Sequence, residues 1–243
     1  MNNIIAYSLW GNDPKYIQGA FHNIKLLPKE FPGWKIRIYH DESVNEDTLD
    51  KLSKCDNVSL INVEMWGSRP ELSAPIINFT SSGTSTWRNW MPSYGMFWRY
   101  CIADDPQVDR FIIRDLDDRL NKHDKAAVDE WVESGKPFHI MRCVPVHNYL
   151  VMGGLWGAVQ DKFPPGFAMN KTILDYEMTA HPHDVYRDQR FLGEHFFPLA
   201  QNNCVVHGLD FDFESGDVRE FPTSNKLGGV YEPHIKTWEE GNA

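Results

Sequence analysis

Residues 111 to 120 read "FIIRDLDDRL", three apolar residues followed at once by charged ones. The run of Phe and Ile predicts a buried strand, and the charges after it predict that the strand ends at the edge of a sheet. Ligands of open α/β sheets bind beyond the carboxyl ends of the strands. Asp115 and Asp117 follow the strand with one residue between them, so in an extended chain both carboxylates point the same way. The stretch therefore predicts a carboxylate pair at the ligand-binding edge of a sheet.

A pair of carboxylates at that edge needs a cation, because the two negative charges repel each other. Hard oxygen ligands suit Mg²⁺ or Mn²⁺, and an ion held by only one or two carboxylates usually also holds a diphosphate. D-x-D alone is a weak signal. A solvated strand end, with Arg114 and Arg119 in surface ion pairs with the aspartates, is the simpler alternative, and such pairs contribute little to stability.

The rest of the chain alternates between apolar strands and amphipathic helices. We expect strands at residues 3–9, 35–40, 58–64, 111–113 and 138–143, and helices at 15–27, 46–54, 93–104, 124–134 and 186–196. Strand, helix and strand at this spacing predict a parallel sheet with crossover helices. Residues 67–92 are rich in Ser, Thr, Gly and Pro and predict a long functional loop. No linker or repeat interrupts the pattern, so we predict a single domain over residues 1–243.

Composition and charge narrow the classes of function. The formal net charge of −10 opposes binding to a phosphate backbone, although a local basic patch could override it. Four cysteines without a CxxC spacing argue against a zinc cage or a disulfide framework. The N-terminal residues do not have the pattern of a signal peptide, and no window of about 18 apolar residues would span a membrane. We expect a cytoplasmic protein, of the cell or of the host if the chain is viral.

Four segments in a fixed order resemble a known family. They are "MFWRYCIADDPQVDRFIIRDLDD" (96–118), "MGGLWGA" (152–158), "YRDQRFL" (186–192) and "NNCVVHGLD" (202–210). This order resembles GT-A glycosyltransferases, especially the retaining group that includes glycogenin and the bacterial lipopolysaccharide galactosyltransferases. The resemblance implies a GT-A (Rossmann-like) α/β fold, with a mixed, mostly parallel sheet flanked by helices.

A closer resemblance is to small single-domain bacterial and viral proteins of glycosyltransferase type with an R-D-x-D-S-R core. It covers the chain from Ser8 to about Gly229 and includes "SLWG" and "WRY". The chain departs from that pattern in three places. Asp118 replaces the Ser of the core, residues 122–124 replace an Arg-Glu pair, and Cys143 replaces a frequent Asp. The carboxylates of D-x-D are intact.

The resemblance implies a metal site and a donor site. Asp115, Asp117 and His207 would bind Mn²⁺ or Mg²⁺, and Arg99 would brace Asp115 and the diphosphate, for which a guanidinium is suited. The loop that begins with Ser8 and Leu9 and ends at Gly11 would contact the base and ribose of the donor. Asp41, at the end of the second strand, could also bind the base or ribose. The simpler alternatives are a surface Arg99 and a turn role for Asp41.

The remaining site residues would contact the donor sugar. Gly153 and Gly154 would let the sugar approach the backbone closely, although a strand bulge would also use glycines. The resemblance assigns sugar hydroxyls to Asp188 and the reactive face of the anomeric carbon to Gln189, and a helix-surface pair is the alternative. Among the histidines, "HPHD" at 181–184 with His195 matches no metal cage and reads as a loop. His139 or His147 could contact the acceptor, but a structural role is simpler.

These residues together predict a metal-dependent glycosyltransferase. It would move a hexose or pentose from a nucleotide-diphosphate sugar, most simply a UDP-sugar, to an acceptor hydroxyl. The order of the double glycine, Asp188 with Gln189, and His207 resembles that of the retaining group, so the resemblance implies retention of anomeric configuration. The alternative is an inverting enzyme in which Asp188 serves as the general base. The acceptor is open between a glycan, a protein and a modified DNA base, and the acidic charge disfavours the last. A nucleotidyltransferase and a non-catalytic nucleotide-sugar binding protein are the alternatives.

Overall fold

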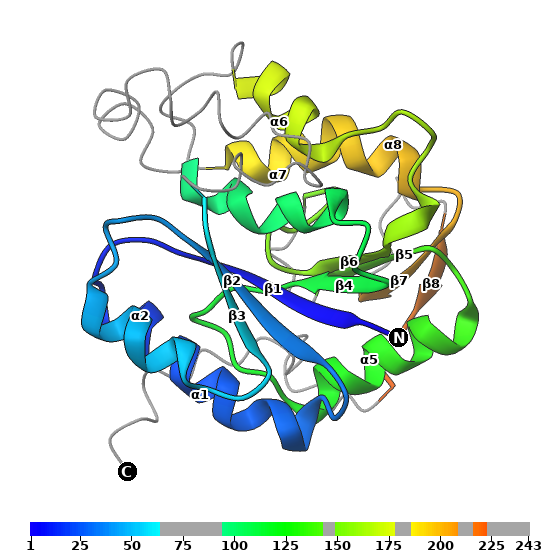
Figure 1. Ribbon diagram of the computed structural model, residues 1–243. Coiled ribbons are helices and arrows are strands. Elements are labelled where there is room, and N and C mark those ends of the chain that lie inside the picture. Colours follow the sequence, from blue (N-terminus) through cyan, green and yellow to red (C-terminus); the bar gives the residue numbers. More distant parts are fainter. Residues whose placement is uncertain (64–93, 143–148, 178–185, 209–215, 223–243) are drawn as a thin grey trace.

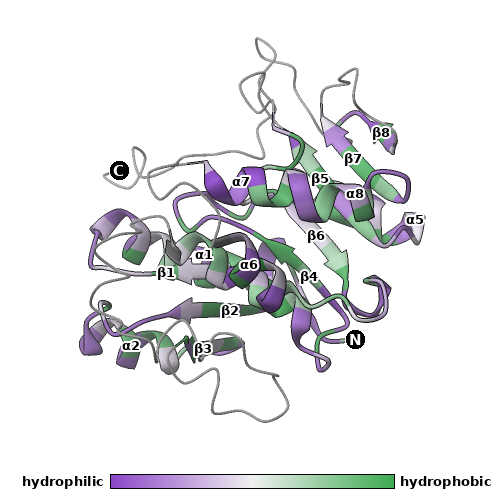
Figure 2. Cartoon of the chain, turned by 90° about the horizontal axis from the view of Figure 1, so that it is seen from above, coloured by the Kyte–Doolittle hydropathy of each residue, from purple (hydrophilic) through white to green (hydrophobic). Residues whose placement is uncertain are grey.

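The computed structural model of the chain describes residues 1–63, 94–142, 149–177, 186–208 and 216–222. Within these residues eight strands form one sheet in the order β3-β2-β1-β4-β6-β5-β7-β8, which Figure 2 shows from above. The strands are β1 (Asn3–Leu9), β2 (Lys35–His40), β3 (Val58–Asn62), β4 (Arg110–Ile113), β5 (Phe138–Arg142), β6 (Trp156–Val159), β7 (Cys204–Gly208) and β8 (Asp217–Arg219). Strand β6 is antiparallel to β4 and β5, and the other pairs are parallel. The predicted mixed, mostly parallel α/β sheet is therefore confirmed.

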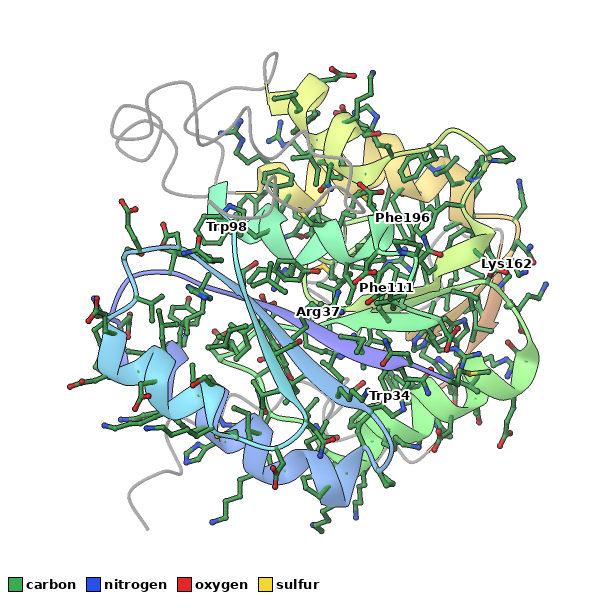
Figure 3. All side chains as sticks on the ribbon, in the orientation of Figure 1. Trp34, Arg37, Trp98, Phe111, Lys162 and Phe196 are labelled. Carbon is green, nitrogen blue, oxygen red and sulfur yellow. The ribbon has the colours of Figure 1, made fainter. Side chains whose placement is uncertain are left out.

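Helices cover both faces of the sheet (Figure 1). One face carries α1 (Pro14–Glu30), α2 (Glu46–Ser53) and α5 (Lys122–Ser134). The other face carries the 3₁₀ helix η2 (Tyr94–Asp104), α6 (Met169–Glu177), α7 (Arg187–Phe191) and α8 (Phe197–Ala200). Two apolar clusters fill the two layers: Phe111 and Phe196 belong to one and Trp34 to the other, as Figure 3 shows. The central strands β1, β4, β5 and β7 between them are buried on both faces, which explains the continuous apolar runs in the sequence.

Local signals set the ends of the helices. Asp13 caps α1 by accepting a hydrogen bond from the Lys15 amide, and proline follows at the first helical position. The helix continues past the predicted end at residue 27, because Pro28 in the last turn removes one hydrogen bond without stopping the chain. Asn121 caps α5, and Gly135 ends it in the left-handed conformation.

Other elements differ in detail from the prediction. The helix predicted at 93–104 is present as η2, wound as a 3₁₀ helix. The helix predicted at 186–196 consists of α7 followed by the π-helix η4 (Leu192–Phe196). Helix α6, the short 3₁₀ helix η3 (Gln160–Lys162) and strand β8 were not predicted. The loop predicted at 67–92 lies outside the described residues, and the single domain stays a prediction. Every helix that the structure describes is too short or too polar to cross a bilayer.

The strand order creates a switch point beside β1. The chain runs from β1 to β2 and β3 on one side and then returns through η2 to β4 on the other side. Because β1 and β4 are parallel, with Ala6 opposite Ile113, their carboxyl ends meet. The Arg114 amide donates to the Ala6 carbonyl at 3.2 Å and extends this pairing. Ligands of open α/β sheets bind at such a point, and the two aspartates of D-x-D follow it.

Candidate active site

The charges of the opening stretch separate into two groups. Arg114 points into the core and binds Asp124 of α5, with Nε 3.0 Å from Oδ2 and Nη2 2.7 Å from Oδ1. Arg119 donates from Nη1 to the Leu116 carbonyl at 2.9 Å. These contacts differ from the surface ion pairs that Arg114 and Arg119 would form with the aspartates if D-x-D were only a solvated strand end. Asp115 and Asp117 line a cleft instead.

The cleft consists of two adjoining hollows. The β1 hollow is lined by Ser8, Leu9, Trp10, Tyr16, Met96, Arg99, Asp115, Leu116 and Asp117. The α7 hollow is lined by Met96, Arg99, Asp115, Asp118, Met152, Gly153, Gly154, Leu155, Tyr186, Asp188 and Gln189. Arg99 and Asp115 line both hollows, so this ion pair stands where the two meet. Of the predicted catalytic and donor-binding residues, all except Asp41 line the cleft.

Arg99 is the centre of the cleft's charge network, and it is buried, not a surface arginine. Its Nη1 donates to Asp115 Oδ1 and to the Arg114 carbonyl, the latter at 3.0 Å. Its Nη2 lies 3.7 Å from Asp188 Oδ2, and its amide donates to Ser8 Oγ at 3.1 Å. Burial alone would lower the pKa of Arg99, but the neighbouring carboxylates raise it above its usual value. The guanidinium thus stays charged and ties two carboxylates from different elements together.

Asp188 begins α7 and is almost fully buried. Its Oδ2 lies 3.1 Å from the Tyr100 hydroxyl, which also lies 3.0 Å from the Gly153 carbonyl. Its Oδ1 accepts from the Gln189 amide at 2.8 Å. Burial raises the pKa of Asp188, Arg99 opposes this, and Asp115 adds to it, with a net rise. A buried carboxylate with a raised pKa in a cleft is a common feature of functional sites.

The two glycines face these carboxylates because nothing larger fits there. A Cβ on Gly153 would lie 2.2 Å from Asp188 Oδ2, and one on Gly154 would lie 2.0 Å from Asp115 Oδ2. Neither residue belongs to strand β6, which begins at Trp156, so a strand bulge is not their role. The glycines allow the backbone to approach the carboxylates closely.

Gln189 and Tyr186 complete the α7 hollow. The Gln189 Oε1 atom is buried, and it has no hydrogen-bond partner among the residues described. An unsatisfied buried carbonyl oxygen at the wall of a cleft is costly without a partner, so a bound ligand is one way to satisfy it. Tyr186 is 48% exposed and packs beside Tyr149, with ring centroids 5.4 Å apart. This ring presents an aromatic surface at the rim of the hollow.

The D-x-D carboxylates each have a cationic partner from the protein. Asp115 is bound by Arg99, and Asp117 Oδ2 lies 2.6 Å from Lys15 Nζ. Two oxygen ligands separated by one residue fit a hard divalent cation whose other ligands are diphosphate oxygens and water. Within the described part of the chain, no group of three or more His, Cys, Asp or Glu side chains could hold a metal ion. The arrangement fits a metal shared with a substrate, not a complete protein cage.

The structure does not bring His207 into a metal group with Asp115 and Asp117. His207 is fully buried in β7, with Nδ1 2.9 Å from His139 Nε2 and Nε2 3.0 Å from Glu130 Oε2. Both ring nitrogens are therefore engaged, and neither offers a free lone pair. Burial lowers the pKa of both histidines. Asp210 and Asp212, which follow His207 in the sequence and are the alternative candidates for a third metal ligand, lie outside the described residues, as do His147 and residues 181–184.

Asp41 has a structural role in the turn after β2. Its Oδ1 accepts from the amide of Ser43 at 3.0 Å and also from the Ser43 hydroxyl. The hydroxyl oxygen of Ser43 in turn accepts from the Gly11 amide at 2.7 Å. Asp41 thus joins the loop after β2 to the loop after β1, and it is absent from the lining of both hollows. The turn alternative describes Asp41 better than direct donor contact.

Sequence reasoning did not assign three residues at the cleft. Tyr16 lines the β1 hollow, Lys15 contacts Asp117 and Tyr100 contacts Asp188. All three lie in segments that the resemblance matched or bordered, "WRY" and "SLWGNDPKY". Trp10 and Tyr16 stack with ring centroids 6.4 Å apart and form one wall of the β1 hollow. Their proximity depends on the turn between β1 and α1. In the sequence, the only sign of this stacking is that an aromatic residue lies on each side of the turn.

Comparisons with known proteins give structural similarity only. No protein-family model and no curated protein sequence matches the chain. A structure of S. aureus TarS, residues 1–349, aligns with 10% identity and a TM-score of 0.48, over 85% of this chain and 58% of that one. The galactosyltransferase LgtC, in complex with donor and acceptor sugar analogs, aligns with 11% identity and a TM-score of 0.46, over 85% and 73%.

A glycosyltransferase involved in glycosylation of the major capsid of PBCV-1 also aligns. Its identity is 15% and its TM-score 0.44, over 85% of this chain and 81% of that one. At these scores and identities the similarities do not assign the chain to a family.

Proposed function

We propose that this protein is a metal-dependent glycosyltransferase that moves a sugar from a nucleotide-diphosphate sugar to an acceptor hydroxyl. One observation carries the proposal: Arg99 joins Asp115 to Asp188 where two hollows meet at the switch point of the sheet. One hollow has aromatic walls and a carboxylate pair, and the other has glycines, a buried carboxylate and an unsatisfied amide. A ligand with a base at one end, a sugar at the other and a diphosphate between them matches this order.

The diphosphate would lie beside Asp115 and Asp117. These carboxylates would hold Mn²⁺ or Mg²⁺, which would offset the negative charge that builds on the departing diphosphate. Arg99 holds the Asp115 carboxylate in place beside the cleft, where it would receive the cation. The Arg114 carbonyl anchors the guanidinium and Ser8 anchors the Arg99 backbone amide, so little reorganisation is needed when a donor binds.

The nucleoside end would occupy the β1 hollow. Trp10 and Tyr16 offer flat apolar faces of the kind that bases stack on, and Ser8 and Leu9 form the floor. The preference for UDP comes from the sequence resemblance. The sheet edge at Leu9 leaves backbone groups of the β1 loop beside this hollow, where polar edges of a base could bind.

The sugar would occupy the α7 hollow, with its hydroxyl groups donating to Asp188. Gly153 and Gly154 leave room for it against the backbone. The unsatisfied Gln189 Oε1 supports a role beside the anomeric carbon, where a carbonyl oxygen can stabilise a developing positive charge but cannot accept a proton. This favours attack by the acceptor on the same face that the diphosphate leaves, and hence retention. The acceptor would be a glycan, a protein or a modified DNA base, and a net charge of −10 disfavours the last.

Donor hydrolysis tests the proposal without knowledge of the acceptor. A panel of UDP-sugars is incubated with the protein and Mn²⁺, and released UDP is measured. We expect slow release from at least one donor and a loss of about a hundredfold or more in Asp117→Asn, because the charge on the leaving group is then poorly offset. Circular dichroism and thermal unfolding check that the variant is folded.

Two other outcomes lead elsewhere. Tight binding of UDP-sugars without any release of UDP would favour the non-catalytic binding protein. Release of pyrophosphate from a nucleoside triphosphate in the presence of a sugar phosphate would favour the nucleotidyltransferase. Asp117→Asn with wild-type release of UDP would remove the metal assignment.

A further inference from the structure

Lys15 is held against Asp117 by the geometry of the first turn of α1. Its amide donates to the capping Asp13 Oδ1 at 2.9 Å, which fixes the start of the helix. Its ammonium Nζ lies 2.6 Å from Asp117 Oδ2 and 5.0 Å from the centroid of the Tyr16 ring. Burial lowers the pKa of Lys15, but Asp117 more than compensates and raises it, so the group is charged. A lysine is therefore paired with the carboxylate that the proposed metal would need as a ligand.

The two ion pairs of D-x-D differ in how firmly their cations are anchored. The Arg99 side chain is 5% exposed and has further contacts with Arg114 and Asp188. The Lys15 side chain is 29% exposed, and Asp117 is 15% exposed. A guanidinium is a rigid fork, whereas an ammonium on a four-carbon stem is a mobile point charge. Arg99 is thus a fixed partner of Asp115, and Lys15 is an exchangeable partner of Asp117.

We propose that Lys15 is a displaceable counter-ion of Asp117, which gives way to the divalent cation and then binds the diphosphate. The proposal rests on the proposed function, because it requires a metal at Asp117. A metal ion and an ammonium group compete for the same carboxylate oxygen, so binding of one weakens binding of the other. The stem of Lys15 is long enough for the ammonium to leave Asp117 and remain at the β1 hollow, where the phosphate oxygens would lie.

This exchange has two consequences with opposite signs. Without a nucleotide, Lys15 competes with the metal, so its removal tightens metal binding. With a nucleoside diphosphate and saturating metal, Lys15 binds phosphate, so its removal weakens nucleotide binding. Metal binding and nucleotide binding therefore depend on each other through Lys15, and this coupling is reciprocal. A lysine that only bound phosphate would show the second effect alone, and a structural lysine would show neither.

The test compares the wild type with Lys15→Gln. Lys25→Gln is the control, because Lys25 is an exposed residue of the same helix and its loss changes the net charge equally. Binding of Mn²⁺ alone is measured from the electron paramagnetic resonance signal of free Mn²⁺. Binding of UDP is then measured by isothermal titration calorimetry at saturating Mn²⁺.

We expect Lys15→Gln to bind Mn²⁺ about two- to fivefold more tightly, as a partly exposed ion pair allows. We expect it to bind UDP about three- to tenfold more weakly, as the loss of a charged phosphate contact implies. The control should match the wild type in both. Mn²⁺ affinity in Lys15→Gln that equals or falls below that of the wild type would overturn the proposal.

Asp117→Asn separates failure of this inference from failure of the metal site. If the wild type binds Mn²⁺ and Asp117→Asn does not, the site exists, and the result for Lys15→Gln judges the counter-ion role alone. If Asp117→Asn binds Mn²⁺ as the wild type does, or if the wild type binds Mn²⁺ neither alone nor together with UDP, the metal is not held at Asp117, and both proposals fail.

Discussion

The hydroxyl of Tyr100 lies 3.1 Å from Oδ2 of Asp188, which makes a tyrosine of η2 the neighbour of a carboxylate on α7. The hydroxyl is fully buried, and burial raises its own pKa far above the usual value, so it stays protonated and acts as a donor. It stabilises the ionised form of Asp188, as Arg99 does, against the burial that favours the protonated form. The balance among these three effects sets the pH at which Asp188 can accept hydrogen bonds from a sugar.

We expect donor binding to weaken as the pH falls through the raised pKa of Asp188, because a protonated carboxyl is a poorer acceptor. This occurs at a higher pH than the ordinary value of about 3.9 for Asp. Tyr100→Phe removes a hydrogen bond to the charged form, so the pKa should rise further and the acid limb should move to higher pH. The pH profile of UDP-sugar hydrolysis at low donor concentration measures this. An unmoved or downward-shifted limb would contradict the role of Tyr100.

Two neighbouring glycines provide a second prediction, because each faces a different carboxylate. A Cβ on Gly154 would lie 2.0 Å from Asp115 Oδ2, so Gly154→Ala should displace Asp115 from Arg99 and weaken Mn²⁺ binding. A Cβ on Gly153 would collide with Asp188 instead, so Gly153→Ala should keep Mn²⁺ binding and lose donor-sugar binding. We expect each variant to lose UDP-sugar hydrolysis by about a hundredfold, the usual cost of misplaced catalytic groups.

Gly193→Ala is a suitable control for these glycines. Its Cβ would lie 3.3 Å from the flexible end of Leu150, outside the lining of the cleft, and this methyl group can move. Mn²⁺ binding by electron paramagnetic resonance and UDP-sugar binding by calorimetry separate the two effects. Equal losses of Mn²⁺ binding in Gly153→Ala and Gly154→Ala would indicate a general disturbance of the turn and not two separate contacts.

The positions of the glycines, the aspartates and Arg99 in the cleft could be expected from the sequence, and their partners could not. An apolar strand that ends in D-x-D predicts carboxylates at a sheet edge, and the edge is where the structure has them. The partner of each charge depends on elements distant in sequence. Arg114 binds Asp124 at the start of α5, and Asp117 binds Lys15, about a hundred residues earlier. Nothing in local periodicity selects these pairs.

The structural roles of Asp41 and His207 were not predicted either. Asp41 ends a strand, as a donor-binding residue would, but a serine two residues later satisfies its carboxylate. His207 also follows an apolar strand run, and only the pairing of β5 with β7 brings it to His139. The reversal of β6 depends on the turn through Gly153 and Gly154, for which the sequence indicated only two glycines in an apolar stretch.

The buried pair His139 and His207 leads to a third prediction, on stability. Burial lowers the pKa of His139 well below its usual value, and His207 and Arg114 add to this effect. Burial also lowers the pKa of His207, with Glu130 opposing it. The unfolded chain takes up protons below about pH 6.5 that these folded histidines do not, so stability is present above that pH and is lost as the pH falls. Urea unfolding between pH 7.5 and 5 measures the slope.

His139→Phe should flatten this slope, because it removes the more strongly shifted histidine. The phenyl ring can keep the stacking on Trp131, where the imidazole lies with ring centroids 5.2 Å apart. At pH 7.5 we expect a loss of about 1–3 kcal/mol, because Nδ1 of His207 then lacks its partner. An unchanged slope would show that the pair does not set the acid sensitivity.

Urea unfolding and Mn²⁺ binding, measured on His207→Gln, decide whether His207 is a metal ligand. Both of its ring nitrogens are engaged, by His139 and Glu130, so we expect stability to fall and Mn²⁺ affinity to stay within about twofold of the wild type. A loss of Mn²⁺ affinity in a folded His207→Gln protein would return His207 to the ligand set that the sequence resemblance implies.

The fourth prediction concerns stereochemistry and depends on Gln189. An inverting enzyme needs a general base opposite the leaving group, and Asp188, one of the carboxylates that line the α7 hollow, could serve. Asp188 is instead held by Tyr100, Arg99 and the Gln189 amide, which suits an acceptor of hydrogen bonds from a bound sugar. Gln189 contributes a buried oxygen with no partner among the residues described, available to a positive charge at the anomeric carbon. We therefore expect Gln189→Ala to slow UDP-sugar hydrolysis by about a hundredfold with little change in donor affinity, and Asp188→Asn to weaken donor affinity as well. Proton NMR of the first-formed product reports the configuration through its anomeric coupling. A coupling that matches the donor's shows retention, whereas the opposite coupling would show inversion and assign the base role to Asp188.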